Sequence, residues 1–129
     1  MPHASQLEVL VVDDTTVSRA LICDSLTKIG VTNVRVAKDG QAALQLMMAR
    51  SAHLVVSDYN MPNMNGLELL KALRQNKGTA RVGFILVSGR NDNAIITEGR
   101  KFGLNNFIAK PFTTDGMKAC LEKVVGKLA

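Results

Sequence analysis

The sequence predicts an α/β fold in which one open, doubly wound parallel β-sheet is covered by helices on both faces. Short apolar runs rich in β-branched residues alternate five times with longer stretches of helical period, which is typical of a parallel sheet. The short runs are apolar at successive positions, as in strands buried on both faces. With 129 residues, 47% of them hydrophobic, the chain has material for one core and too little for two. We therefore expect residues 1–129 to form one domain.

Five strands are expected where these apolar runs occur. The connections to the following helices are short, which favours right-handed crossovers, and five units suit an open sheet better than a closed eight-unit barrel. The predicted strands are Glu8–Val12, Val34–Ala37, Leu54–Ser57, Gly83–Val87 and Phe107–Ala109.

The first helix is expected after Asp14 and Thr15, which are both good N-caps, and it should end before Gly30. Its apolar residues recur at helical spacing and predict one face packed on the sheet. These residues are Val17, Leu21, Ile22, Leu26 and Ile29.

The later helices follow the same plan. The second follows Asp39, the third begins near Gly66 and the last runs from about Thr114. The fourth, at residues 93–102, is the least regular because Gly99 lies inside it and its apolar residues are few. We expect it to be the most mobile helix.

The net charge of +5 comes from the second half of the chain. Residues 1–64 contain five Lys/Arg and six Asp/Glu, whereas residues 65–129 contain eleven and five. The sequence has no helix-turn-helix pattern, zinc finger or set of stacking aromatics, so nucleic-acid binding is not expected. We interpret the basic half as a solvated face.

The compartment is predicted from what the sequence lacks. The longest apolar runs are strand-sized and the N-terminus has no basic flank before an apolar stretch, so we expect a cytoplasmic protein without membrane insertion. Cys23 and Cys120 lack metal-ligand spacing and are interpreted as small buried hydrophobes. A disulfide between them is the less favoured alternative in a reducing compartment.

Polar residues follow the predicted strands, and the second strand, which is expected at an edge of the sheet, ends in Ala37 and Lys38. Asp13 and Asp14 follow the first strand, Asp58 the third, Ser88 the fourth and Lys110 the fifth. Open α/β sheets bind their ligands at this end of the strands, so we expect these side chains around one crevice. Each alone has an ordinary explanation as a cap, a turn residue or a surface charge. Their joint position at successive strand ends indicates a functional site.

The chemistry of this set favours a metal and a phosphoryl group. Three carboxylates in one crevice repel one another, and a cation relieves the repulsion. Oxygen ligands without His or Cys select a hard ion, and few protein oxygens plus water suit Mg²⁺ or Mn²⁺ better than Ca²⁺. Ser88 and Lys110 are suited to phosphoryl oxygens, and a carboxylate nucleophile forms an acyl phosphate.

These residues resemble a known family, the receiver domain of two-component response regulators, and within it the single-domain chemotaxis regulators. The matching motifs are VVDD at 11–14, SDYNMPNMNGLELLKALR at 57–74, Ser88, and KPF at 110–112. Together, in this order and at the family's spacing, they are specific. The resemblance implies a flavodoxin-like (βα)5 domain with strand order 2-1-3-4-5 and no output domain.

The resemblance also implies roles for the acidic residues. Asp58 is expected to be the phosphoacceptor, which receives the phosphoryl group from a sensor histidine kinase or a small acyl phosphate. The metal ligands would be Asp13, Asp14, Asp58 and the backbone carbonyl of Asn60, with Asp14 binding directly and Asp13 mainly through water. The protein would be a switch with only its own phosphorylation and dephosphorylation, not an enzyme.

The remaining implied roles belong to the switch. Ser88 would hydrogen-bond the phosphoryl group and Lys110 would pair with it, and a cis bond is expected before Pro111. Phe107 stands where tyrosine is common in chemotaxis regulators and would swing inward as Ser88 moves. Gly89 stands where alanine is usual and could loosen this loop.

The target surface implied by the family is formed by the fourth helix, fifth strand and fifth helix. Basic residues there favour an acidic target, and Arg90 could also alter the lifetime of the phosphorylated state. The protein is expected to be a monomer. The expected output residues are Arg90, Arg100, Lys101, Lys118 and Lys123.

Several functions stay open from the sequence. A switch that binds a flagellar motor component is favoured by the resemblance, and a phosphate sink or phosphorelay shuttle for another partner fits the same chemistry. A magnesium-dependent phosphohydrolase is less favoured because minimal loops leave little material for a substrate pocket. A flavin carrier is weaker still, because no Ser/Thr/Gly-rich phosphate loop follows the first strand.

Overall fold

The computed structural model describes residues 3–89 and 93–128. Five parallel strands form one sheet in the order β2-β1-β3-β4-β5, which confirms the predicted flavodoxin-like topology. Each strand lies within one residue of its predicted bounds. The strands are β1 (Glu8–Val12), β2 (Asn33–Ala37), β3 (Leu54–Asp58), β4 (Gly83–Ser88) and β5 (Asn106–Ala109).

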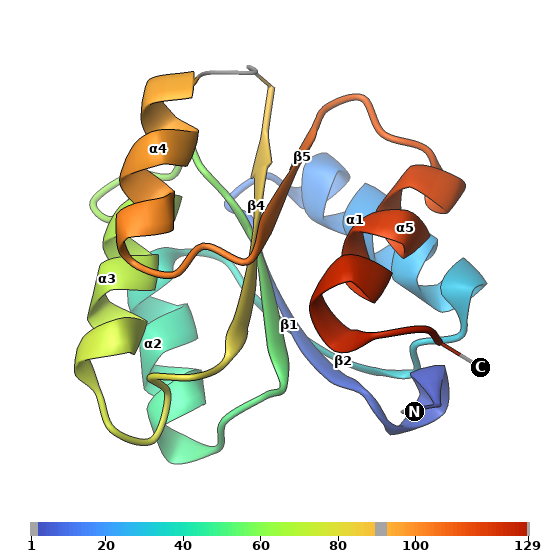
Figure 1. Ribbon diagram of the computed structural model, residues 1–129, viewed down its shortest axis with the longest axis horizontal. Coiled ribbons are helices and arrows are strands. Elements are labelled where there is room, and N and C mark those ends of the chain that lie inside the picture. The colour runs from blue at the N-terminus through green and yellow to red at the C-terminus, as the bar shows by residue number, and fades with distance from the viewer. Residues whose placement is uncertain (1–2, 90–92, 129) are drawn as a thin grey trace.

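Five α-helices connect and follow these strands, and a short 3-10 turn, η1 (Ala4–Gln6), precedes β1. Helices α1 and α5 cover one face of the sheet, whereas α2, α3 and α4 cover the other (Figure 1). The helices are α1 (Thr16–Ile29), α2 (Gly40–Ala49), α3 (Gly66–Gln75), α4 (Asn93–Lys101) and α5 (Thr114–Val125).

The two faces of the sheet carry two separate hydrophobic cores. In β1, Leu10 and Val12 point to the core under α2 and α3, while Val9 and Val11 point to the core under α1 and α5. This alternation is the two-residue period of a strand. Because both faces are buried, the strands are apolar at successive positions, as the sequence predicted.

Asp39 and Gly30 lie at helix ends as predicted, whereas Thr15 is the N-cap of α1 without a side-chain capping bond. The Asp39 side chain accepts a hydrogen bond from the Ala42 N–H at the start of α2. Asn65 and Glu68 form a capping box at the start of α3. Gly30 ends α1 with φ of +107°, a left-handed conformation that glycine adopts without steric cost.

The predicted apolar face of α1 is wrong at two positions. Ile22 and Leu26 are buried, but the side chains of Val17 and Leu21 are 70% and 59% exposed. Adjacent helical positions are about 100° apart, so Leu21 and the residue one turn before it lie beside the stripe that contains Ile22. The first half of α1 therefore presents apolar side chains to solvent.

Gly99, which made α4 the least regular predicted helix, has a packing role. A Cβ at this position would lie 2.8 Å from Cδ2 of Leu104, so a larger residue would require the Leu104 side chain, in the α4–β5 connection, to shift. The predicted mobility of α4 stays a prediction.

Cys23 and Cys120 are both free thiols, the first half-buried and the second buried. Burial raises the pKa of the Cys120 thiol to about 11, which suits a packing role. None of the helices in the described residues is long and apolar enough to cross a membrane.

Candidate functional site

The strand register brings the predicted site residues to one edge of the sheet. Val12 in β1 pairs with Ser57 in β3, so the next residues, Asp13 and Asp58, lie side by side at the carboxyl ends of these two strands. Ser88 ends β4 beside Ala109 in β5, and the Lys110 N–H donates to the Ser88 carbonyl at 2.8 Å. The ends of β1, β3, β4 and β5 thus lie along one edge of the sheet, and the side chains of Asp13, Asp58 and Lys110 meet in one crevice there.

Three carboxylates form the floor of this crevice. Ligand oxygens of Asp13, Asp14 and Asp58 all lie within 4.8 Å of one another. Asp13 and Asp58 are buried, whereas Asp14 is exposed. This group, with Lys110, is called the acidic pocket below.

Among the buried side-chain atoms of the described residues, one oxygen of the acidic pocket lacks a hydrogen bond. Oδ1 of Asp13 accepts from the Thr15 N–H at 2.9 Å. Oδ2 of Asp13 is buried and has no hydrogen-bond partner within residues 3–89 and 93–128, although Nζ of Lys110 lies 3.8 Å away. A buried polar atom left in this way costs free energy, which is characteristic of a site that binds something else.

Lys110 supplies the positive charge of the crevice. Its Nζ lies 3.4 Å from Oδ1 of Asp58, closer than to Asp13. The peptide bond between Lys110 and Pro111 is cis, as the resemblance implied. Among the described residues, the Lys110 ammonium thus lies within ion-pair distance of carboxylates at the ends of β1 and β3.

Burial raises the pKa of Asp58 above its ordinary value, because a charged carboxylate is poorly solvated in this crevice. The nearby charge of Asp13 raises this pKa further, whereas Lys110 and the Tyr59 backbone N–H lower it. Ionisation of Asp58 is therefore less favourable than for a carboxyl group in water, and a bound cation would favour it.

The donor set fits a hard divalent cation. Within the part of the chain that the structure describes, three carboxylates converge, no His or Cys joins the cluster, and one buried oxygen is without a hydrogen bond. Mg²⁺ and Mn²⁺ prefer such oxygen ligands and complete their shells with water. Asn60, whose carbonyl was predicted to be a ligand, lies two residues after Asp58 at an exposed position in the β3–α3 connection.

The predicted switch and output residues occupy different places. Phe107 is half-buried and packs against the core under α2 and α3. Arg100 and Lys101 are exposed on α4, and Lys118 and Lys123 are exposed on α5, on either side of the edge strand β5. Arg90 lies outside the described residues.

Two site residues were not assigned a role from the sequence. Nη1 of Arg19 donates to the carbonyl oxygen of Asp13 at 2.7 Å. A Cβ on Gly66 would lie 2.6 Å from the Asp58 carbonyl oxygen, so only glycine allows α3 to start against the end of β3. Gly66 belongs to the motif at 57–74, which was the available signal, whereas a lone arginine in a helix carries none.

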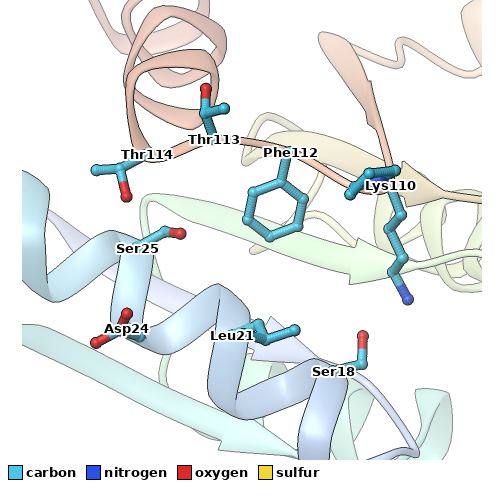
Figure 2. Close-up of a pocket in the computed structure, with 9 residues that line it drawn as sticks. Ser18, Leu21, Asp24, Ser25, Lys110, Phe112, Thr113 and Thr114 are labelled. Atoms are coloured by element: carbon cyan, nitrogen blue, oxygen red, sulfur yellow. The ribbon is translucent and has the colours of Figure 1, made fainter.

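A pocket of about 540 Å³ adjoins the acidic pocket and shares Lys110 with it. It lies between α1 and the β5–α5 connection, where Phe112 points toward Leu21 and hydroxyls of Ser18 and Thr114 stand at its border (Figure 2). The exposed Leu21 is thus part of the surface next to the crevice.

Sequence comparison connects this geometry to known proteins. The family model for the response regulator receiver domain matches residues 9–122. A probable chemotaxis protein CheY of Rhizobium etli is 41% identical over 128 residues, which cover 99% of each chain. A chemotaxis protein CheY homolog of Campylobacter jejuni is 37% identical over 121 residues, or 93% of each chain.

Structure comparison agrees with the sequence comparison. Chemotaxis protein CheY4 of Vibrio cholerae superposes with a TM-score of 0.85 at 28% identity, over 92% of this chain and 98% of that one. The receiver domain of a Pseudomonas aeruginosa sensor histidine kinase, which holds magnesium in its active site cleft, has a TM-score of 0.84 at 22% identity. The second match covers 94% of this chain and 98% of the other, and it shows the shared fold.

Proposed function

We propose that this chain, which belongs to the response regulator receiver domain family, is a phosphorylation switch whose phosphoacceptor is Asp58. The observation that carries the proposal is the acidic pocket itself. Asp58 lies among carboxylates that need a cation, beside an ammonium that can pair with a phosphoryl group.

The proposed reaction is a phosphoryl transfer from a phosphohistidine of a sensor histidine kinase. A carboxylate oxygen of Asp58 attacks phosphorus, a P–O bond forms, and the P–N bond breaks with its electron pair leaving on the imidazole nitrogen. The product is an acyl phosphate on Asp58. Bound Mg²⁺, or Mn²⁺, would neutralise charge on the phosphoryl oxygens and the carboxylates.

The residues of the crevice divide this work. Asp13, Asp14, Asp58 and the Asn60 carbonyl would hold the cation, which suits the oxygen of Asp13 that has no hydrogen bond. Lys110, now 3.4 Å from Asp58, would transfer its ion pair to a phosphoryl oxygen.

Ser88 would hydrogen-bond the same phosphoryl group, and its movement would let Phe107 turn inward. The phosphoryl charge then biases two conformations of the β4–α4 connection and of α4.

Motor control in chemotaxis is the output that we propose. The two curated relatives above are named as chemotaxis proteins and match over nearly their full length, which supports a receiver that works as a single domain. Exposed basic residues on α4 and α5 suit an acidic target on a flagellar motor switch protein. Charge reversal at Lys118 and Lys123 should weaken such binding, and unchanged binding would contradict this part of the proposal.

The decisive experiment is a titration of the protein with a peptide from a flagellar motor switch protein. Magnesium is present throughout, and beryllofluoride is added or omitted to mimic the phosphoryl group. The control is Asp58→Asn, which keeps the side-chain shape and removes the nucleophile. We expect beryllofluoride to tighten peptide binding in the wild type and to have no effect on the variant.

Other results would redirect the proposal. If beryllofluoride occupies the site in the wild type but peptide affinity does not change, the phosphoacceptor function stands and a phosphate sink or phosphorelay shuttle replaces motor control. If neither beryllofluoride nor a small acyl phosphate modifies the wild type, the phosphoacceptor function itself is wrong.

A further inference from the structure

Arg19 links the second turn of α1 to the end of β1. Its side chain is half-buried, and Nη1 donates to the carbonyl oxygen of Asp13 at 2.7 Å, a short bond for a charged donor. Its own N–H donates to the Thr15 carbonyl at 2.9 Å. Among the described residues, no carboxylate lies within ion-pair distance of this guanidinium. The charged group instead donates its hydrogen bond to a neutral carbonyl.

The bond from Arg19 completes the hydrogen bonding of Asp13. The Asp13 N–H donates to the Ala37 carbonyl at 3.1 Å, and Oδ1 accepts from the Thr15 N–H. With its carbonyl held by Arg19, Asp13 keeps one polar atom without a hydrogen bond, Oδ2, which is the oxygen facing Lys110. Two contacts thus hold the Asp13 main chain, one holds its carboxylate, and one carboxylate oxygen is left for a ligand.

The same bond constrains Asp14. The carbonyl of Asp13 belongs to the peptide plane that continues into the Asp14 nitrogen, so fixing its oxygen fixes that plane. The Asp14 Cα lies in the same plane, so the bond also fixes the point from which the Asp14 side chain extends. Helix α1 offers little alternative support, because its N-cap Thr15 makes no side-chain capping bond.

We propose that Arg19 is a positioning residue of the acidic pocket, which orients Asp13 and Asp14 for the divalent cation through the Asp13 carbonyl. The inference rests on the proposed function, since it concerns the same metal site. Partners that orient metal ligands commonly change metal affinity by tenfold or more when they are removed.

Charge and positioning predict opposite results for Arg19→Met. Methionine keeps the apolar stem and removes the donor and the positive charge. If Arg19 acted only through its charge, its removal would make the pocket more negative and tighten Mg²⁺ binding. If Arg19 positions the carboxylates, its removal should weaken Mg²⁺ binding, and we expect the Kd to rise by about tenfold.

The experiment is a Mg²⁺ titration followed by tyrosine fluorescence, without any phosphodonor. The chain has one Tyr and no Trp, so the signal reports Tyr59, which adjoins Asp58. Arg81→Met is the matched control, because Arg81 is exposed and lies in the α3–β4 connection. The control removes the same charge and should leave the Kd within about twofold of the wild type, since screened distant charges interact weakly.

Arg19→Lys provides a second variant that keeps the charge and one donor group. Its Kd should lie between those of the wild type and Arg19→Met. A Kd for Arg19→Met equal to or lower than that of Arg81→Met would overturn the inference, as would weaker binding by Arg19→Lys than by Arg19→Met. If the wild type does not bind Mg²⁺ at all, the proposed metal-dependent function and this inference both fall.

Discussion

Two charged regions of this molecule differ in how completely their polar side chains are hydrogen-bonded. In the acidic pocket, at the carboxyl ends of the strands, carboxylates crowd together and a buried oxygen of Asp13 has no hydrogen bond. At the other end of β4 and β5, the side chain of Arg74 is surrounded by acceptors. This second region, formed by Arg74 and its acceptors in residues 80–82 and 102–105, is called the Arg74 corner.

The Arg74 corner satisfies every donor of the guanidinium. Nε donates to Phe102, Nη1 to Ala80 and Val82, and Nη2 to Gly103 and Asn105, at distances of 2.8 to 3.2 Å. A guanidinium has five N–H donors, so none is left over. The acceptors are four backbone carbonyls and one amide oxygen, and they join the end of α3 to the connections that lead into β4 and β5.

The difference between the regions shows how the same fold separates stability from chemistry. A half-buried charge such as Arg74 that is fully hydrogen-bonded stabilises the chain around it, because its partial desolvation is offset at every donor. A crowded and incompletely bonded group costs stability and is ready to bind a ligand. We therefore expect the acidic pocket to lower the free energy of unfolding of the protein and the Arg74 corner to raise it.

The largest expected effect is at Arg74. Arg74→Met should lower the free energy of unfolding by about 3 kcal/mol, because several carbonyl acceptors lose a charged donor. Urea unfolding without magnesium measures this loss. Arg81→Met, an exposed arginine nearby in sequence, should change it by less than about 0.5 kcal/mol. An Arg74→Met protein as stable as the control would show that the corner is not a source of stability.

Asp13 should show the opposite sign. Asp13→Asn keeps an acceptor for the Thr15 N–H and removes a buried charge that repels Asp58. Without magnesium we expect unfolding to become harder by about 1 kcal/mol, since an incompletely paired buried charge is relieved. Magnesium should stabilise the wild type more than the variant, because a ligand raises the free energy of unfolding only to the extent that it binds the folded protein, and the variant has one metal-binding carboxylate fewer. Urea unfolding with and without MgCl₂ tests both statements, and a variant less stable than wild type without magnesium would contradict the first.

The smallest expected effect is the pH dependence that Asp58 contributes. Its pKa is raised in the folded protein, so between the ordinary carboxyl value of about 4 and the folded value the folded state binds more protons than the unfolded state. Stability should therefore fall as the pH rises through this window and recover on acidification. Asp58→Asn, which cannot titrate, should lack this slope.

The difference in unfolding free energy between wild type and Asp58→Asn, measured in urea at several pH values without magnesium, isolates the contribution of this carboxyl. A difference that grows in favour of the wild type as the pH rises would mean that Lys110 outweighs burial at Asp58.

The sequence by itself determined the strands, the helices and the set of residues in the acidic pocket. Strands buried on both faces leave a local apolar pattern, and the carboxyl ends of parallel strands meet at one edge of the sheet. The residue after each strand therefore identifies the crevice without knowledge of any contact. Asp13, Asp58 and Lys110 could be grouped in this way because the rule needs only strand ends.

Only the tertiary structure decided which groups are buried, which are satisfied and which support the site. Arg74 contacts residues 28 to 31 positions away, and no local pattern encodes such a reach. The exposure of Val17 and Leu21 depends on which side of α1 packs on the sheet, and helical spacing alone assigned them to the core. Arg19 looks like a surface residue in the sequence. Its role follows from a 2.7 Å bond that exists only when α1 packs beside the end of β1.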